Sequence, residues 1–286
     1  METVTAIVYL AGLCVALAAV LALAHRGLYV WEDPRIEQVA DMLPGANCGA
    51  CGVPGCRAFA EHVVAGTLQP GQCPVGGSDT ALRVAGYLGI DAGSLERRVA
   101  RLLCAGGDDV AIQLATYEGH ASCRGAATIA GGAKGCTYGC LGLADCEEAC
   151  TFDAIRMASN GLPVVDFEAC TGCGDCVTAC PKGLFALYPV RRKLVVQCRS
   201  LLEGDDALET CRVACTGCTL CVADAPEGLM RMENTLPVID PSRTDLETPL
   251  ATYRCPTGAI AWIEDQQFPD LHPLAYPEKS PENVHA

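Results

Sequence analysis

Closely spaced cysteines constrain this chain more than any other feature of its sequence. The chain has 286 residues, 21 cysteines and five histidines, and most cysteines fall in tight groups with two or three residues between neighbours. Neighbours this close rarely bridge each other, and disulfide frameworks are typical of short secreted chains. Zinc sites usually draw two ligands from each of two places, often with histidine. Groups of three or four cysteines without a nearby histidine therefore favour iron–sulfur clusters over zinc sites and disulfides.

The acidic charge of the chain argues against one class of partner. The formal net charge is −14, whereas nucleic-acid binding needs a basic surface that replaces counterions. The two short basic runs, at residues 97–98 and 191–193, are typical of solvated faces. We therefore expect no nucleic-acid partner.

An uncharged stretch near the N-terminus predicts a membrane anchor. The 21 residues of 4–24 carry no charge, which is enough for a helix to cross a hydrocarbon core of ~30 Å. A cleaved signal peptide would have a basic segment before a shorter apolar core, but only Glu2 precedes this run and Arg26 follows it. The positive-inside rule then places the body of the chain in the cytoplasm. We expect residues 1–26 to be a single-pass anchor in the cell (inner) membrane, with Cys14 as a lipid-facing or packing residue.

A glycine-rich cysteine loop follows the predicted anchor. Its motif NCGACGVPGC and one later cysteine provide four thiols, separated by two, four and sixteen residues: Cys48, Cys51, Cys56 and Cys73. A [4Fe–4S] cluster needs thiolates that converge from several directions, and interleaved glycines let a loop wrap around it because they tolerate positive φ. We expect a small helical [4Fe–4S] domain at 27–90, with a zinc site as the alternative.

The region 91–190 carries the pattern of a two-cluster ferredoxin. Its second run of cysteines, followed by Pro181, has the bacterial ferredoxin spacing C-x2-C-x2-C-x3-C-P. Its first run is spaced x3, x5, x3, with Thr151 in place of the proline. In ferredoxins, each run supplies three ligands to one cluster and its fourth cysteine to the other. The predicted sets are Cys136, Cys140, Cys146 and Cys180 for one cluster, and Cys150, Cys170, Cys173 and Cys176 for the other.

A second, partly degraded ferredoxin-like module is predicted at 191–263. The module keeps one ligand set: Cys215, Cys218, Cys221 and Cys255. Ala225 occupies the position of the missing fourth cysteine of its first run, and residues 244–251 contain no cysteine triplet. These missing cysteines would all bind the same cluster, so a module that lost that one cluster would lack all of them. We therefore expect a fourth [4Fe–4S] cluster here, and the alternative is that Cys211 replaces one of these ligands.

The remaining soluble cysteines leave three interpretations open. Cys104, Cys123, Cys198 and Cys211 fall in pairs related by the internal repeat. They could bind a further cluster or a zinc ion, behave as buried thiols, or form a redox-active pair.

The Pro-rich residues 264–286 predict a disordered tail. The predicted fold class is α+β: a transmembrane helix, a helical cluster domain and tandem ferredoxin-like modules.

The order of these motifs resembles the B subunit of the Rnf complex, an ion-translocating oxidoreductase, in the long form with a second ferredoxin-like module. The resemblance covers residues 1 to about 260, and its most specific pieces are GANCGACGVPGC, AGGAKGCTYGCLGLADC and CTGCGDCVTACPKG. It implies an electron carrier without catalytic residues that is reduced by soluble ferredoxin and passes electrons to the other Rnf subunits. Those partners would couple electron flow toward NAD, or another acceptor, to Na⁺ or H⁺ transport. The chain departs from the family pattern where its second module has lost cysteines.

Other functions remain to be weighed against this one. The sequence has no GxGxxG after a predicted strand and no P-loop, so we expect this chain to bind neither flavin nor NAD. A polyferredoxin subunit of a membrane hydrogenase is an alternative electron carrier. A zinc-binding scaffold protein is an alternative from another class. As a further hypothesis, the basic run at 191–193 would dock an acidic ferredoxin.

Overall fold

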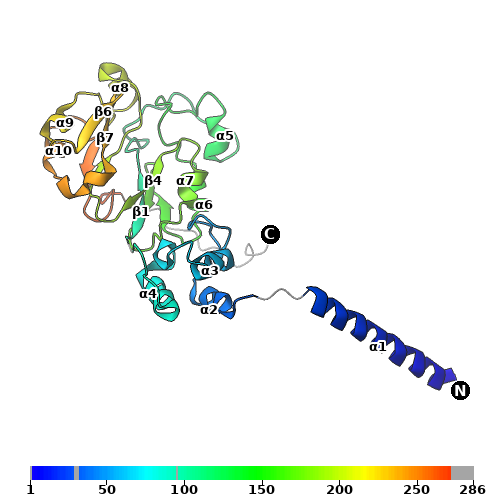
Figure 1. Cartoon of the computed structure of the whole chain (residues 1–286). Coiled ribbons are helices and arrows are strands. Elements are labelled where there is room, and N and C mark those ends of the chain that lie inside the picture. The colour runs from blue at the N-terminus through cyan, green and yellow to red at the C-terminus, as the bar shows by residue number, and fades with distance from the viewer. Residues whose placement is uncertain (1, 29–31, 95, 272–286) are drawn as a thin grey trace.

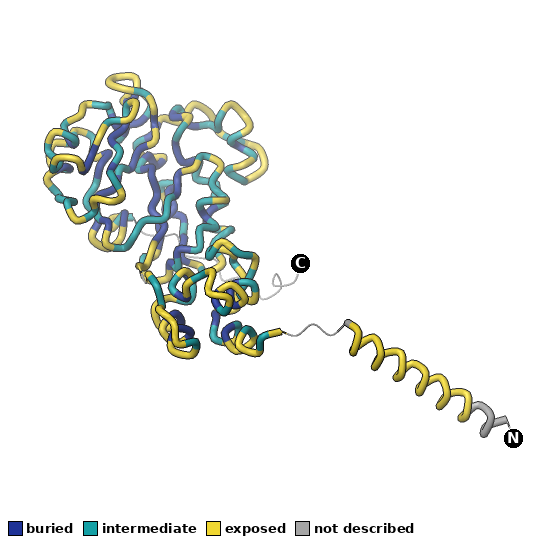
Figure 2. The backbone as a smooth tube through the Cα atoms, in the orientation of Figure 1, coloured by how far each residue is buried: buried dark blue, intermediate teal, exposed yellow. Residues whose placement is uncertain are grey.

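A long apolar helix, α1 (Glu2–Leu28), precedes the folded body in the computed structural model, which describes residues 2–28, 32–94 and 96–271 (Figure 1). Its segment Ile7–Gly27 is long and apolar enough to cross a membrane, and none of it is buried against protein (Figure 2). Tyr9 and Leu23, for example, are 76% and 71% exposed. A helix of a soluble protein would bury one apolar stripe, whereas α1 is apolar and exposed all round. The predicted apolar N-terminal helix is therefore confirmed.

Three helices with their own apolar core form the region after α1. They are α2 (Pro34–Met42), α3 (Cys56–Val64) and α4 (Gly77–Leu88), with the short 3-10 helix η1 (Pro70–Gln72) between the last two. The Asp33 carboxylate caps α2 by accepting a 2.9 Å hydrogen bond from the Arg35 N–H. Val39, Phe59 and Val84 are at most 1% exposed and pack together. This core fixes α3, whose first residue is Cys56, against its neighbours.

Short strands and short helices form the next region. Strand β1 (Arg98–Leu102) pairs antiparallel with β4 (Phe185–Pro189), and β2 (Ile155–Met157) pairs antiparallel with β3 (Pro163–Val165). The helices are α5 (Cys123–Ala127), α6 (Asp145–Glu148) and α7 (Asp175–Ala179). The apolar core between them includes buried cysteines, among them Cys140, Cys146 and Cys176. The mixture of helices and short strands agrees with the predicted α+β class.

The following region repeats the same strand arrangement. Strand β5 (Leu194–Val196) pairs antiparallel with β8 (Ile260–Trp262). Between them in the sequence lies the antiparallel hairpin of β6 (Met230–Glu233) and β7 (Leu236–Ile239). Its helices are α8 (Gly204–Thr210), α9 (Leu220–Asp224), η2 (Pro241–Leu246) and α10 (Leu250–Tyr253). Ala225, Leu246 and Ala251 belong to one apolar core. Apolar packing therefore occupies the part of this module where the sequence has lost its cluster cysteines.

The two strand-containing regions are joined by a shared core and by the segment after β8. Leu103, Val195 and Ile263 are nearly fully buried against one another. Gln267 accepts a 2.9 Å hydrogen bond from the Leu102 N–H and donates a 2.5 Å bond to the Leu102 carbonyl. Residues 264–271, predicted to begin a disordered tail, are thus held on β1, because a buried strand backbone needs hydrogen-bond partners. The rest of that predicted tail, 272–286, lies outside the described residues.

Candidate iron–sulfur sites

The glycine-rich loop before α3 brings its four predicted cysteines around one pocket: Cys48, Cys51, Cys56 and Cys73. Gly55, at φ +94°, turns the chain into α3 and lies beside Asn47, where an added Cβ would come within 3.0 Å of the side-chain oxygen. That oxygen accepts a 2.8 Å hydrogen bond from the Cys56 N–H. Burial raises the pKa of Cys73, the Gly76 N–H opposes this effect, and the charges of the three other thiols raise the pKa further. The four thiols therefore face one another.

The predicted ferredoxin set with the regular x2, x2 spacing also lines one pocket: Cys150, Cys170, Cys173 and Cys176. Burial raises the pKa of Cys176 to about 12, and the nearby charges of the other three thiols add to the shift. The Ala100 N–H lies 3.5 Å from the sulfur of Cys170, and the Ala154 N–H donates to the sulfur of Cys150 at 3.3 Å. Such N–H···S hydrogen bonds are a main way in which proteins stabilise and tune an iron–sulfur cluster.

The second ferredoxin set differs from the prediction by one residue. Burial raises the pKa of Cys146, and the next causes are the charges of Cys140, Cys123 and Cys180, in that order. Cys123, at the first position of α5, is held there because its N–H donates a 2.8 Å hydrogen bond to the carboxylate of Asp145. The structure thus brings Cys123 to the position that the sequence assigned to Cys136.

Cys136 lies elsewhere because the residues just before it are tied to an earlier segment. Lys134 forms an isolated β-bridge with Gln113, and the Gly135 N–H donates a 2.7 Å hydrogen bond to the carbonyl of Ile112. The sequence contained a signal for this difference. The first run is spaced x3, x5, x3 instead of the x2, x2, x3 of a ferredoxin run.

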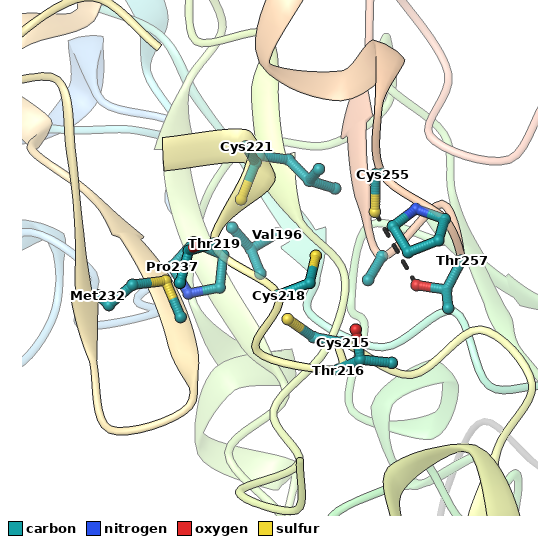
Figure 3. Close-up of a pocket in the computed structure, with 13 residues that line it drawn as sticks. Val196, Cys215, Thr216, Cys218, Thr219, Cys221, Met232, Pro237, Cys255 and Thr257 are labelled. Atoms are coloured by element: carbon teal, nitrogen blue, oxygen red, sulfur yellow. Dashed lines mark hydrogen bonds between the residues drawn. The ribbon is translucent and has the colours of Figure 1, made fainter. Parts of the chain in front are cut away.

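The set predicted in the second module converges on one pocket: Cys215, Cys218, Cys221 and Cys255. Figure 3 shows the three thiols of the α9 region opposite Cys255, which comes from the segment after α10. Burial raises the pKa of Cys221 to about 11. Burial acts in the same direction on Cys255, but hydrogen bonds from the backbone of Ile260 and from Thr257 outweigh it and lower the pKa of this thiol.

The four remaining thiols of the soluble part divide between two places. Cys123 completes the ferredoxin set described above, whereas Cys104, Cys198 and Cys211 line a further pocket together with Cys136 and Lys134. Cys14, in α1, contributes to none of the thiol pockets.

The spacing of the thiols is unsuited to a single metal ion. Within the described residues, no group of three or more His, Cys, Asp or Glu side chains is placed to hold one ion. Four sulfurs on a zinc ion would each lie about 2.3 Å from it, and so within about 4.6 Å of one another. In a [4Fe–4S] cluster the thiolates bind at separate irons. The thiol sets therefore fit an extended cluster better than a zinc ion.

The basic run predicted to dock ferredoxin is only partly exposed, because its central residue is buried. Arg192 is 7% exposed and lies 3.5 Å from the buried carboxylate of Glu247. Its guanidinium also lies 4.1 Å from the centre of the Tyr188 ring. Arg191 is paired with Glu96. Arg192 therefore serves a contact between segments of the chain, and Arg191 is the exposed residue of the run at which the docking hypothesis can be tested.

Two family models match parts of the chain that contain these thiols. The model described as "Putative Fe-S cluster" matches residues 43–75, which include all four thiols of the N-terminal set. The model described as "4Fe-4S binding domain" matches residues 161–182, which include the regular ferredoxin run. Both matches agree with an iron–sulfur protein.

Curated relatives match most of the chain. The B subunit of the Na(+)-translocating ferredoxin:NAD(+) oxidoreductase complex of Acetobacterium woodii is 46% identical over 77% of this chain and 66% of its own length. The B subunit of the ion-translocating oxidoreductase complex of Methanosarcina acetivorans is 38% identical over 73% of this chain and 80% of that protein. The B subunit of the proton-translocating ferredoxin:NAD(+) oxidoreductase complex of Clostridium ljungdahlii is 39% identical over 85% of this chain and 87% of that protein.

Proposed function

Because the chain belongs to the family of B subunits of the ion-translocating oxidoreductase (Rnf) complexes, we propose that it is the membrane-anchored electron relay of such a complex. It is an iron–sulfur subunit of an ion-translocating ferredoxin:NAD⁺ oxidoreductase complex. In this proposal, reduced ferredoxin donates electrons to the chain. The chain passes them to partner subunits that reduce NAD⁺, or another acceptor, and couple the flow to Na⁺ or H⁺ transport.

The convergence of thiols in fours is the observation that carries the proposal. When bound, each [4Fe–4S] cluster supplies a one-electron exchange site. Four ligand sets are proposed: Cys48, Cys51, Cys56 and Cys73; Cys123, Cys140, Cys146 and Cys180; Cys150, Cys170, Cys173 and Cys176; and Cys215, Cys218, Cys221 and Cys255. Thiolates that line one pocket repel, and bound iron would relieve this repulsion because it binds the deprotonated form.

The two sets of the first ferredoxin-like module are neighbours. The charge of Cys176, from one ferredoxin set, contributes to the raised pKa of Cys146, from the other. The residues of this chain position the electron carriers, set their potentials through N–H···S hydrogen bonds and burial, and exclude water from them. Partner subunits carry the ion path, because α1 has no ionisable side chain within residues 4–24 apart from the thiol of Cys14 and the phenol of Tyr9.

The exposed helix α1 supports a place for the chain at the membrane. His25 and Arg26 lie in its last turn, at the end from which the chain continues to the folded body. Positive residues favour the cytoplasmic end of a span. We therefore place the body at the cytoplasmic face of the cell membrane, where soluble ferredoxin is present and thiols stay reduced.

Anaerobic purification followed by reduction with ferredoxin tests the proposal. The protein should be brown, and substoichiometric reduced ferredoxin should produce the EPR signals of reduced [4Fe–4S] clusters. Four sets require about sixteen iron and sixteen sulfide per chain. A colourless protein with stoichiometric zinc would support a scaffold and overturn the proposal. Clusters that accept electrons from a hydrogenase but not from ferredoxin would support the polyferredoxin alternative.

A further inference from the structure

A fifth set of four thiols lies between the two ferredoxin-like modules: Cys104, Cys136, Cys198 and Cys211. All four are buried, with 5–9% exposure. Their pocket has a volume of about 340 Å³, open solvent included, and the three other pockets that contain a complete thiol set have about 300, 310 and 370 Å³. A pocket of matching size with the same number of thiols has room for the same ligand.

Each module contributes an equivalent pair of these thiols. Cys104 stands two residues after the end of β1, and Cys198 stands two residues after the end of the equivalent strand β5. Cys136 stands four residues before Cys140, and Cys211 stands four residues before Cys215. Because the pairs obey the internal repeat, their meeting at the junction follows from how the modules pack.

The backbone around the pocket comes close to the sulfurs and directs N–H groups at them. A Cβ added to Gly106 would lie 3.0 Å from the sulfur of Cys211 and 3.6 Å from the sulfur of Cys104. The Cys140 N–H lies 3.5 Å from the sulfur of Cys104. Backbone hydrogen bonds also reach the sulfurs of Cys198 and Cys211. Assigned sets, such as the one around Cys170, have the same N–H···S features.

A buried cation faces this pocket. Lys134 is 4% exposed, donates a 3.0 Å hydrogen bond to the Gly106 carbonyl and lies 3.3 Å from the carboxylate of Asp108. Asp108 itself is half exposed. A buried ammonium group is costly unless negative charge lies nearby. An oxidised [4Fe–4S] cluster with four thiolates has a net charge of about −2 and would provide it.

From this combination we propose that Cys104, Cys136, Cys198 and Cys211 bind a fifth [4Fe–4S] cluster at the junction of the two modules. A zinc ion fits less well, because these side chains do not form a group that could hold one ion. The proposal also explains why Cys123 stands in the ferredoxin set. Cys136 is a ligand of the junction cluster, so another thiol takes its place.

The position of the junction cluster gives it a role, which rests on the proposed function. Cys104 contacts Cys140 of the first module's set, and a backbone hydrogen bond from Cys215 of the second module's set reaches Cys198. The junction cluster therefore links the two modules. With the clusters bound, these residues would hold a carrier that accepts one electron from the set on one side and passes one electron to the set on the other, with no bond made or broken.

The number of irons per chain tests the site directly. The full chain, purified anaerobically in detergent, should contain about twenty iron and twenty sulfide, instead of about sixteen. Replacing both Cys136→Ala and Cys211→Ala should lower both values by about four. Cys14→Ala is the matched control, because Cys14 lies in α1, and it should keep about twenty. A wild-type value of about sixteen, or one zinc per chain lost in the double variant, would overturn the proposal.

A second variant keeps the test meaningful if the double variant does not fold. Lys134→Met should retain about twenty iron and move one midpoint potential to a more negative value in an EPR-monitored redox titration, because the reduced cluster loses a neighbouring positive charge. A purely structural role for Lys134 would lower stability and move no potential, which would contradict the proposal. The proposed function can be contradicted independently of the junction cluster. A protein that contains about twenty iron but is not reduced by ferredoxin would overturn the proposal that ferredoxin is the electron donor, and it would still support the junction cluster.

Discussion

The backbone N–H of Cys140 lies 3.5 Å from the sulfur of Cys104, so that residues of two different thiol sets are in contact. Burial raises the pKa of Cys104 to about 11, and the backbone hydrogen bonds from Cys140 and Gly106 oppose that shift. Burial raises the pKa of Cys140 to about 12, with the Cys104 charge as the next cause. The two sets are electrostatically coupled, as neighbouring sites of one electron path should be.

The first prediction tests which of Cys123 and Cys136 binds the cluster of the first ferredoxin-like module. Cys123→Ala should remove the cluster of Cys140, Cys146 and Cys180, because Cys123 faces Cys146. Cys136→Ala should keep that cluster. Each variant should lose about four iron, but only Cys123→Ala should abolish the EPR spin–spin interaction between the paired clusters of the first module. Loss of that interaction in Cys136→Ala alone would restore the ligand set predicted from the sequence.

The sequence predicted the thiol sets whose ligands follow regular local spacing. The x2, x2 runs, together with Cys150 at the end of the preceding run and Cys255 before Pro256, allowed the sets around Cys170 and Cys215 to be predicted from the sequence pattern. Cys136 was misplaced because its position depends on a non-local contact, the bridge between Lys134 and Gln113. No local pattern encodes such a contact.

The junction site was beyond local pattern for a related reason. The repeat made Cys104 and Cys198 visible as equivalent positions. Their convergence depends on packing between modules, where Leu103 and Val195 share a core. The start of the tail depends on a non-local contact too, because the Pro-rich composition of 264–286 gives no sign that Gln267 would bind the backbone of Leu102.

Removing one hydroxyl should change the potential of the second module's cluster. Hydrogen bonding from Thr257 contributes to the lowered pKa of Cys255 and therefore stabilises the thiolate. Thr257→Val should lower the midpoint potential by roughly 20–60 mV, which corresponds to about 0.5–1.5 kcal/mol for one hydrogen bond. Thr216→Val is the control, since Thr216 lines the same pocket. An EPR-monitored titration measures both, and equal shifts would contradict a specific role for Thr257.

Arg192 should matter for stability and not for ferredoxin docking. Arg192→Met removes the guanidinium that pairs with the carboxylate of Glu247, whose side chain is 3% exposed, and leaves this carboxylate only the hydrogen bonds from the Lys193 and Leu194 N–H groups. The loss should be roughly 3–5 kcal/mol, seen as a lower melting temperature. Arg191→Met should cost about 1 kcal/mol or less, because Arg191 is 63% exposed. The reduction rate by ferredoxin at low salt should be unchanged in Arg191→Met. A marked decrease there would revive the docking hypothesis.

Gln267 should protect the backbone of β1 from solvent. Gln267→Ala leaves both the N–H and the carbonyl of the buried Leu102 without the hydrogen bonds that the side chain provides. Unsatisfied buried groups cost about 1–3 kcal/mol, so hydrogen exchange at the Leu102 amide should become roughly ten- to a hundredfold faster. The neighbouring Gln266 is exposed, and Gln266→Ala should leave the exchange rate unchanged. Equal exchange in the two variants would mean that residues 264–271 do not hold β1, and that the tail begins where the sequence placed it.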